Sequence, residues 1–191
     1  MTPSVCIVKV ESPLDDKTVT LLMPFSPLEK QQRILRQRVK QKADMMIVGG
    51  ALARHILWKT FCIPPGARIA YGEFGKPYLP DYPHAYFNIS HSGSYVVCAV
   101  CDVPVGVDVQ EIVCYRPDIA NRVFNSSELE EIQRSSNLSF EFTRAWTQME
   151  ARMKAAGFRI GINQNSNVPM KYKMSSYLIG DAFLSISYKA R

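Results

Sequence analysis

The chain has 191 residues, of which 47% are hydrophobic and 21% charged, and a formal net charge of +6. This composition can bury a sizeable core, as one domain or two small packed ones, and no apolar run approaches the roughly 20 residues of a membrane-spanning helix. The start, Met1-Thr2-Pro3-Ser4, lacks the pattern of a secretory signal, so we expect a cytoplasmic protein with no membrane partner.

The N-terminal region combines a strand with two helices. Residues 4–10 alternate or run apolar at strand length, whereas residues 17–23 allow more than one assignment. Ser26-Pro27-Leu28-Glu29 predicts a helix start, with Ser26 as the cap and proline at the first helical position. A second helix, residues 43–61, is apolar almost all round and should be buried. The apolar stripe expected for the first helix is Leu28, Ile34, Leu35 and Val39.

Basic residues concentrate in the first helix, between positions 29 and 42, where they predict one strongly basic helix. A solvated helix face is the ordinary interpretation, and an anionic partner is the alternative. Nucleic acid fits less well, because the run has no interleaved aromatic residues and no recognised binding motif. The six cations are Lys30, Arg33, Arg36, Arg38, Lys40 and Lys42.

Short strands follow in the middle of the chain. Residues 85–90, 95–102 and 105–110 read as strands, and their short connections favour antiparallel pairing. Residues 125–128 predict a capped helix, and residues 140–156 a long one that ends at Gly157. Further strands are expected around a polar Asn/Gln/Ser loop, at residues 171–174 and 182–188. Each half therefore combines helices with a small antiparallel sheet, which is an α+β pattern.

The stretch from Ser90 to Cys101 contains two groups that suggest catalysis. Neighbouring strand residues point to opposite faces, so Ser90 and His91 cannot pair as nucleophile and base. Their hydroxyl and imidazole groups suit phosphate binding, although a histidine in a hairpin is the ordinary alternative. Cys98 and Cys101 lack a second pair with metal-ligand spacing, which favours core packing.

Two further pairs could hold a metal ion and a phosphate. Asp108 and Gln110 share one face of a strand whose valines occupy the other face, and magnesium prefers such oxygen ligands. Glu150 and Lys154 project from the same side of a helix. A polar strand face and a surface ion pair explain the same spacings, so spacing alone leaves both interpretations open.

Four motifs in this order resemble the 4'-phosphopantetheinyl transferase superfamily, in its single-chain, two-halved type that activates peptide and polyketide synthases. They are Gly75-Lys76-Pro77, residues 87–93 (FNISHSG), residues 104–109 (PVGVDV) and residues 146–154 (WTQMEARMK). The resemblance implies a pseudo-dimeric α+β fold with halves at residues 1–103 and 104–191. Coenzyme A would lie in the cleft between the halves of a monomer.

The resemblance also implies an activity, the transfer of 4'-phosphopantetheine from coenzyme A to a serine of an apo acyl or peptidyl carrier protein. Asp108 and Glu150 would hold Mg²⁺, with Mn²⁺ as an alternative, and Gln110 would ligate directly or through water. Glu150 would help to deprotonate the carrier serine, directly or through metal-bound water. Lys154 would act beside these two carboxylates in catalysis. The residues expected to contact phosphates or the nucleotide are Lys30, Arg33, Lys76, Ser90, His91 and Lys154.

Three positions depart from the family pattern. Gln110 stands where many members have a glutamate, Met149 where a lysine is usual, and Met45 where a phosphate-contacting arginine is common. The alternative hypothesis is therefore a non-catalytic or weakened relative that binds coenzyme A or a carrier protein without turnover.

Overall fold

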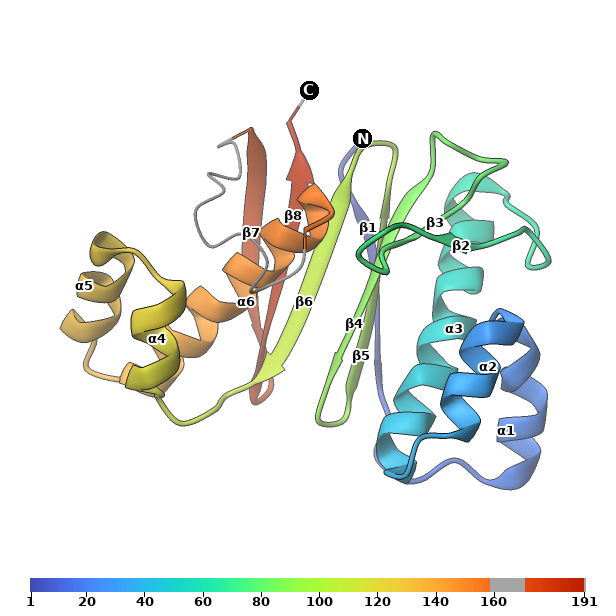
Figure 1. The fold of residues 1–191 in the computed structure, drawn as a ribbon, viewed down its shortest axis with the longest axis horizontal. Helices are drawn as coiled ribbons and strands as arrows, with labels where there is room; N and C mark the ends of the chain where they lie inside the picture. Colours follow the sequence, from blue (N-terminus) through green and yellow to red (C-terminus); the bar gives the residue numbers. More distant parts are fainter. Residues whose placement is uncertain (159–170, 191) are drawn as a thin grey trace.

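The computed structural model describes residues 1–158 and 171–190, and it has the α+β fold that the sequence predicts (Figure 1). Two three-stranded antiparallel sheets stand side by side, each with a long helix against it. The predicted Asn/Gln/Ser loop lies mostly outside the described residues. The division at residues 103 and 104 stays a prediction.

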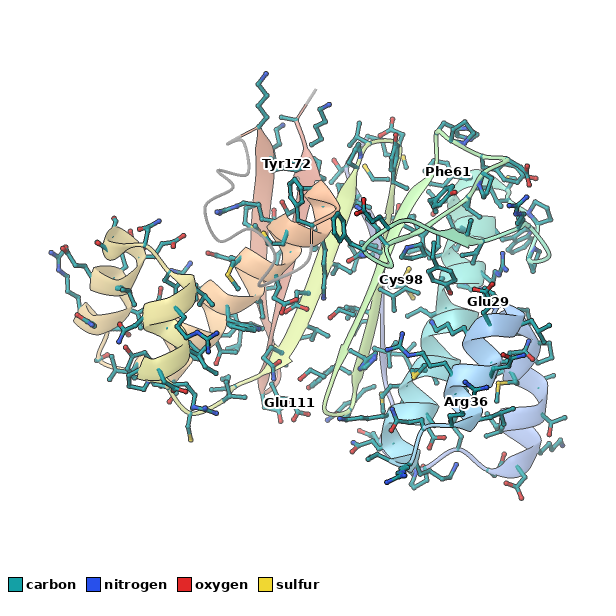
Figure 2. The ribbon with its side chains drawn as sticks, in the orientation of Figure 1. Glu29, Arg36, Phe61, Cys98, Glu111 and Tyr172 are labelled. Atoms are coloured by element: carbon teal, nitrogen blue, oxygen red, sulfur yellow. The ribbon has the colours of Figure 1, made fainter. Side chains whose placement is uncertain are left out.

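The first sheet has the strand order β1 (Ser4–Lys9), β5 (Tyr95–Cys101), β4 (Tyr86–Ser92). All residues of β5 are buried, because helix α3 (Lys40–Phe61) covers one face and the second sheet meets the other. Cys98 lies on the α3 side (Figure 2). Cys98 and Cys101 are free buried thiols, so core packing is confirmed for both.

The second sheet has the order β6 (Val105–Glu111), β8 (Ala182–Lys189), β7 (Tyr172–Ile179). The three valines of β6 are at most 2% exposed and pack against β8 and β5, as their alternation predicts. Antiparallel pairing of β5 with β6 is wrong. Strand β5 already has β1 and β4 as neighbours, and β6 pairs with β8 along its full length.

The basic segment is two helices, which corrects the single helix expected from its charge. Helix α2 (Leu28–Leu35) ends at Arg36, and α3 begins at Lys40. Only Ile34 of the expected apolar stripe is buried. Leu28 and Leu35 lie on the exposed side of α2, and Val39 falls outside that helix and is also exposed.

The serine cap is also wrong. Pro27 takes the cap position, and the Ser26 hydroxyl is buried against Gly50 of α3, where no described residue forms a hydrogen bond with it. A short 3₁₀ turn (Met23–Phe25) brings the chain into this packed position, so tertiary contact overrides the local capping signal. Residues 17–23, which the sequence left open, form helix α1 (Asp16–Leu22) and the start of this turn.

The described residues of the second half also form the helices α4 (Pro117–Val123), α5 (Ser126–Arg134) and α6 (Leu138–Ala156). The cap of α5 is confirmed, because Asn125 and Glu128 form a reciprocal capping box. Gly157, with φ of 82°, ends α6 as expected. The short strands β2 (Ala70–Tyr71) and β3 (Pro77–Tyr78) flank the Gly-Lys-Pro loop. No helix among the described residues combines the length and apolar character needed to cross a membrane.

Candidate active site

The site begins with an unusually close approach between β6 and α6 at Gly106. A Cβ atom added there would lie 2.1 Å from the Ala151 carbonyl oxygen and 2.3 Å from the Ala155 nitrogen. Any side chain at this position would therefore push the helix away from the strand. The glycine lets Asp108 on β6 face the last two turns of α6.

A cluster of charged side chains occupies this contact. The Lys154 ammonium donates to Asp108 Oδ1 at 2.6 Å and lies 3.6 Å from Glu150 Oε2. Asp108 is only 5% exposed, so its pairing with Lys154 compensates the burial of its charge. The structure thus brings together the three residues predicted to be catalytic.

Glu150 has a perturbed carboxyl group. Burial raises its pKa, the neighbouring Lys154 ammonium opposes that rise, and the Asp108 carboxylate adds to it. Glu150 also lines a pocket of about 390 Å³, together with Lys154 and Asn88. The carboxyl group is therefore both shielded from bulk water and open to a molecule in this pocket.

Ser90 joins the cluster from the first sheet. Its hydroxyl donates to Asp108 Oδ1 at 2.7 Å and accepts from Lys154 Nζ at 3.1 Å. It also accepts from the Val109 amide at 3.4 Å. A hydroxyl has one donor and two acceptor positions, so Ser90 is fully occupied by protein groups. Its predicted contact with a phosphate stays a prediction.

Lys76, in the loop after β2, also crosses to the second half. Its ammonium donates to the carbonyl oxygens of Val105, Lys154 and Ala155 at 3.2, 2.6 and 2.9 Å. Burial lowers the pKa of Lys76 to about 8, while the carbonyl end of α6 favours its charged form. Lys76 lines the same pocket as Glu150. Its expected role as a phosphate contact stays a prediction.

A second cavity of about 680 Å³ adjoins the first, since both are lined by Gly75, Pro77 and Ile89. Its walls carry Lys30, Arg33 and His91, the remaining residues predicted to bind the nucleotide. Burial lowers the pKa of Lys30, and burial together with Lys154 and Lys30 lowers that of His91. We call this region the basic cleft. Its Lys30 and Arg33 side chains form no ion pair with any carboxylate of the described residues.

Sequence reasoning missed two members of the site. Lys42 lines the basic cleft from α3, although no sequence pattern distinguishes it from the other cations of the segment. Asn88 lines the same smaller pocket as Glu150 and accepts a hydrogen bond from the Val107 amide at 3.0 Å. The signal for Asn88 was present, because it begins the alternation Asn88-x-Ser90-x-Ser92 on one strand face.

The three departures from the family pattern lie in different surroundings. Gln110 is half-buried, and its amide nitrogen donates to the Glu111 carbonyl oxygen at 3.3 Å. Met149 packs with the aromatic cluster of Phe142 and Trp146. Met45 is 2% exposed and reaches the wall of the basic cleft from the first core.

Comparison with known families gives two matches that follow one another along the chain. The family model described as "4'-phosphopantetheinyl transferase, N-terminal" matches residues 12–102. The model described as "4'-phosphopantetheinyl transferase superfamily" matches residues 104–171, which include Asp108, Glu150 and Lys154.

Individual relatives carry the same name. A 4'-phosphopantetheinyl transferase of Bacillus subtilis is 33% identical over 154 residues, covering 78% of this chain and 68% of the relative. The 4'-phosphopantetheinyl transferase psf-1 of Bacillus pumilus is 35% identical over 161 residues, covering 81% and 69%. The transferase gsp of Aneurinibacillus migulanus is 33% identical over 163 residues, covering 83% and 68%.

Proposed function

The chain belongs to the 4'-phosphopantetheinyl transferase superfamily, and from this membership we propose that it is a magnesium-dependent enzyme of that activity. It transfers 4'-phosphopantetheine from coenzyme A to a serine of an apo acyl or peptidyl carrier protein. The second product is adenosine 3',5'-bisphosphate.

One observation carries the proposal: two carboxylates from separate elements meet one lysine beside a basic cleft. Asp108 comes from β6, and Glu150 comes from α6 with Lys154. Coenzyme A carries its negative charge at a pyrophosphate and at a 3'-phosphate. The basic cleft supplies the charge for the nucleotide end, and the carboxylate pair marks the reacting end.

The carboxylate pair fits a magnesium ion. Both carboxylates already approach a single cation, the Lys154 ammonium, and carboxylate oxygens are the ligands that Mg²⁺ prefers. The described residues contain no group of three or more His, Cys, Asp or Glu that could hold a metal. Magnesium often takes only one or two carboxylates and completes its shell with phosphate oxygens and water. We expect Asp108 and Glu150 to hold the ion, Mn²⁺ being an alternative, and Gln110 to add an oxygen directly or through water.

The reaction requires alignment and charge neutralisation more than covalent participation by the protein. The carrier serine oxygen forms a bond to the phosphorus that bears the pantetheine arm, and the bond from that phosphorus to the nucleotide's bridging oxygen breaks. Bound magnesium would neutralise charge on the pyrophosphate. Glu150 accepts the serine proton, and Lys154 places its positive charge against the phosphoryl oxygens.

The direct test is transfer to a carrier. The purified protein is incubated with coenzyme A, magnesium and a panel of apo-carrier proteins, and intact-mass spectrometry should show a gain of about 340 Da on a carrier serine. Absence of an adduct on every acceptor would overturn the proposal. Binding of coenzyme A by calorimetry without any adduct would instead favour the non-catalytic relative.

A further inference from the structure

Strand β6 has one edge that pairs with no strand in the described part of the chain. In an antiparallel pair, alternate residues direct both their N–H and C=O groups toward the partner strand, and the others direct them away. The carbonyl group of Pro104 and the amide group of Ile112 form hydrogen bonds on the β8 side of the sheet. The odd-numbered residues between them, from Val105 to Glu111, therefore direct their backbone groups toward the first half of the molecule.

Four successive odd-numbered residues of β6 meet a side chain from the first half. Lys76 donates to the Val105 carbonyl oxygen at 3.2 Å. Three amide groups then donate to side-chain oxygens of β4, at distances of 3.0, 3.4 and 3.2 Å. The pairs are Val107 with Asn88 Oδ1, Val109 with Ser90 Oγ, and Glu111 with Ser92 Oγ.

The three β4 contacts share a constant spacing. Each joins residues that are 19 apart in sequence, so β4 and β6 run parallel and in register along this contact. We call this set of bonds the side-chain ladder. At its lower end, Glu111 lies beside the tip of the β4–β5 hairpin (Figure 2), where its carboxylate accepts from the Ser94 amide at 3.1 Å.

The ladder surrounds the reacting end of the site. Asp108 lies between the rungs at Val107 and Val109, and the middle rung, Ser90, also donates to the Asp108 carboxylate. Asn88 and Ser90 are less than 8% exposed, so losing either oxygen would leave a buried amide without a partner. A displaced β6 would carry Asp108 away from Glu150 and Lys154.

We propose that Asn88 and Ser92 are positioning residues, which with Ser90 and Lys76 hold β6 in register against β4 and thereby fix the Asp108 carboxylate. The structural part of this inference stands on the hydrogen bonds alone. Its catalytic part rests on the proposed function. The polar residues of the 87–93 motif then serve two purposes, since His91 faces the basic cleft and the alternate residues face β6.

The structural part is tested without ligand, by amide hydrogen exchange measured with NMR. In Asn88→Ala the Val107 amide should exchange about tenfold faster or more, relative to the amides of β5. In Ser92→Ala the same change should appear at Glu111, and Ser92→Thr should reverse it because threonine keeps the hydroxyl. Asn125→Ala, which removes the α5 cap and costs comparable stability, should leave both amides unchanged relative to β5.

The catalytic part is tested by transfer kinetics on the same variants. Asn88→Ala should lower kcat about tenfold and leave the KM for coenzyme A within about twofold. A rise in KM at constant kcat would instead make Asn88 a substrate contact and overturn the positioning role. Unchanged exchange at both Val107 and Glu111 would overturn the ladder. If exchange responds as expected but wild-type protein transfers nothing, the ladder stands and the proposed function fails.

If Asn88→Ala does not fold, the Ser92 pair decides the matter. Ser92 lines neither the smaller pocket nor the basic cleft, so its alanine variant changes the ladder without touching a bound ligand. A selective loss of Glu111 protection that threonine restores supports the ladder. Equal protection in the alanine and threonine variants contradicts it.

Discussion

The contact between the halves and the basic cleft both carry charged and polar side chains, but they use them differently. At the contact, the polar groups of Ser90, Asp108 and Lys154 bond one another at 2.6–3.1 Å. In the basic cleft, Lys30 and Arg33 form no ion pair with a carboxylate among residues 1–158 and 171–190. Substitutions at the contact should therefore change both structure and chemistry, whereas substitutions in the cleft should change binding alone.

The largest effect is expected at Asp108. Asp108→Ala should lower kcat/KM about a thousandfold or more, because it removes a proposed metal ligand and takes from the half-buried Lys154 its closest partner. Steady-state transfer to a carrier protein measures this loss, and thermal unfolding measures the accompanying destabilisation. Asp81→Asn removes the same charge from an exposed loop and should be neutral in both measurements. An Asp108 variant with near-wild-type activity would remove this residue from the site.

Gly106→Ala should come next, with about a hundredfold loss of kcat and a destabilisation of about 1–3 kcal/mol. The added methyl group meets backbone atoms of α6, which cannot move without displacing Glu150 and Lys154. Gly66→Ala is the matched control, since nothing lies within 4 Å of its added Cβ. Equal behaviour of the two variants would contradict the close approach of strand and helix.

Substitutions in the basic cleft should have a smaller effect, which is confined to the binding of coenzyme A. Lys30→Ala and Arg33→Ala should each raise the KM for coenzyme A about tenfold, at nearly constant kcat and unchanged melting temperature. Arg38 is exposed and does not line the cleft, so Arg38→Ala tests general attraction by positive charge. If all three variants raise KM equally, long-range electrostatics rather than contact in the cleft accounts for binding.

The smallest effect is a dependence of coenzyme A binding on pH, through His91. Burial and two neighbouring lysines lower the pKa of His91 below its ordinary value of 6.5, and a bound phosphate would raise it again. Binding then takes up a proton, so affinity should increase as pH falls from about 7.5 toward 6. Calorimetry should show this slope in the wild type and in His55→Gln, a change on the exposed side of α3, but not in His91→Gln.

The parts of this molecule that follow local rules could be predicted from the sequence. The alternation around Asp108 placed the valines in the core, and the Asn125 cap is correct, because both depend on residues a few positions apart. The prediction of one helix for the basic segment was wrong for the opposite reason. The segment divides at residues 36–39, and the burial of Ser26 depends on its contact with Gly50 of α3, which local sequence does not encode.

The sequence predicted residues that the structure brings together, but it did not predict the hydrogen bonds that they form. Ser90 and Lys76 were expected to face phosphates, yet their hydrogen bonds are made to protein groups. Those bonds join residues 19 and 78 apart in the chain, so only the tertiary arrangement reveals them. Alternating polar residues on β4 signalled a polar neighbour, but not which strand it would be.

The side-chain ladder has a consequence for how this region can vary in sequence. Between ordinary strands the bonds belong to the backbone, so either side chain can change without breaking them. Here the backbone of β6 donates and the side chains of β4 accept. Variation should therefore be restricted unequally: positions 88, 90 and 92 need short side chains with an acceptor oxygen, whereas positions 107 and 109 need only an apolar side chain that fits the core.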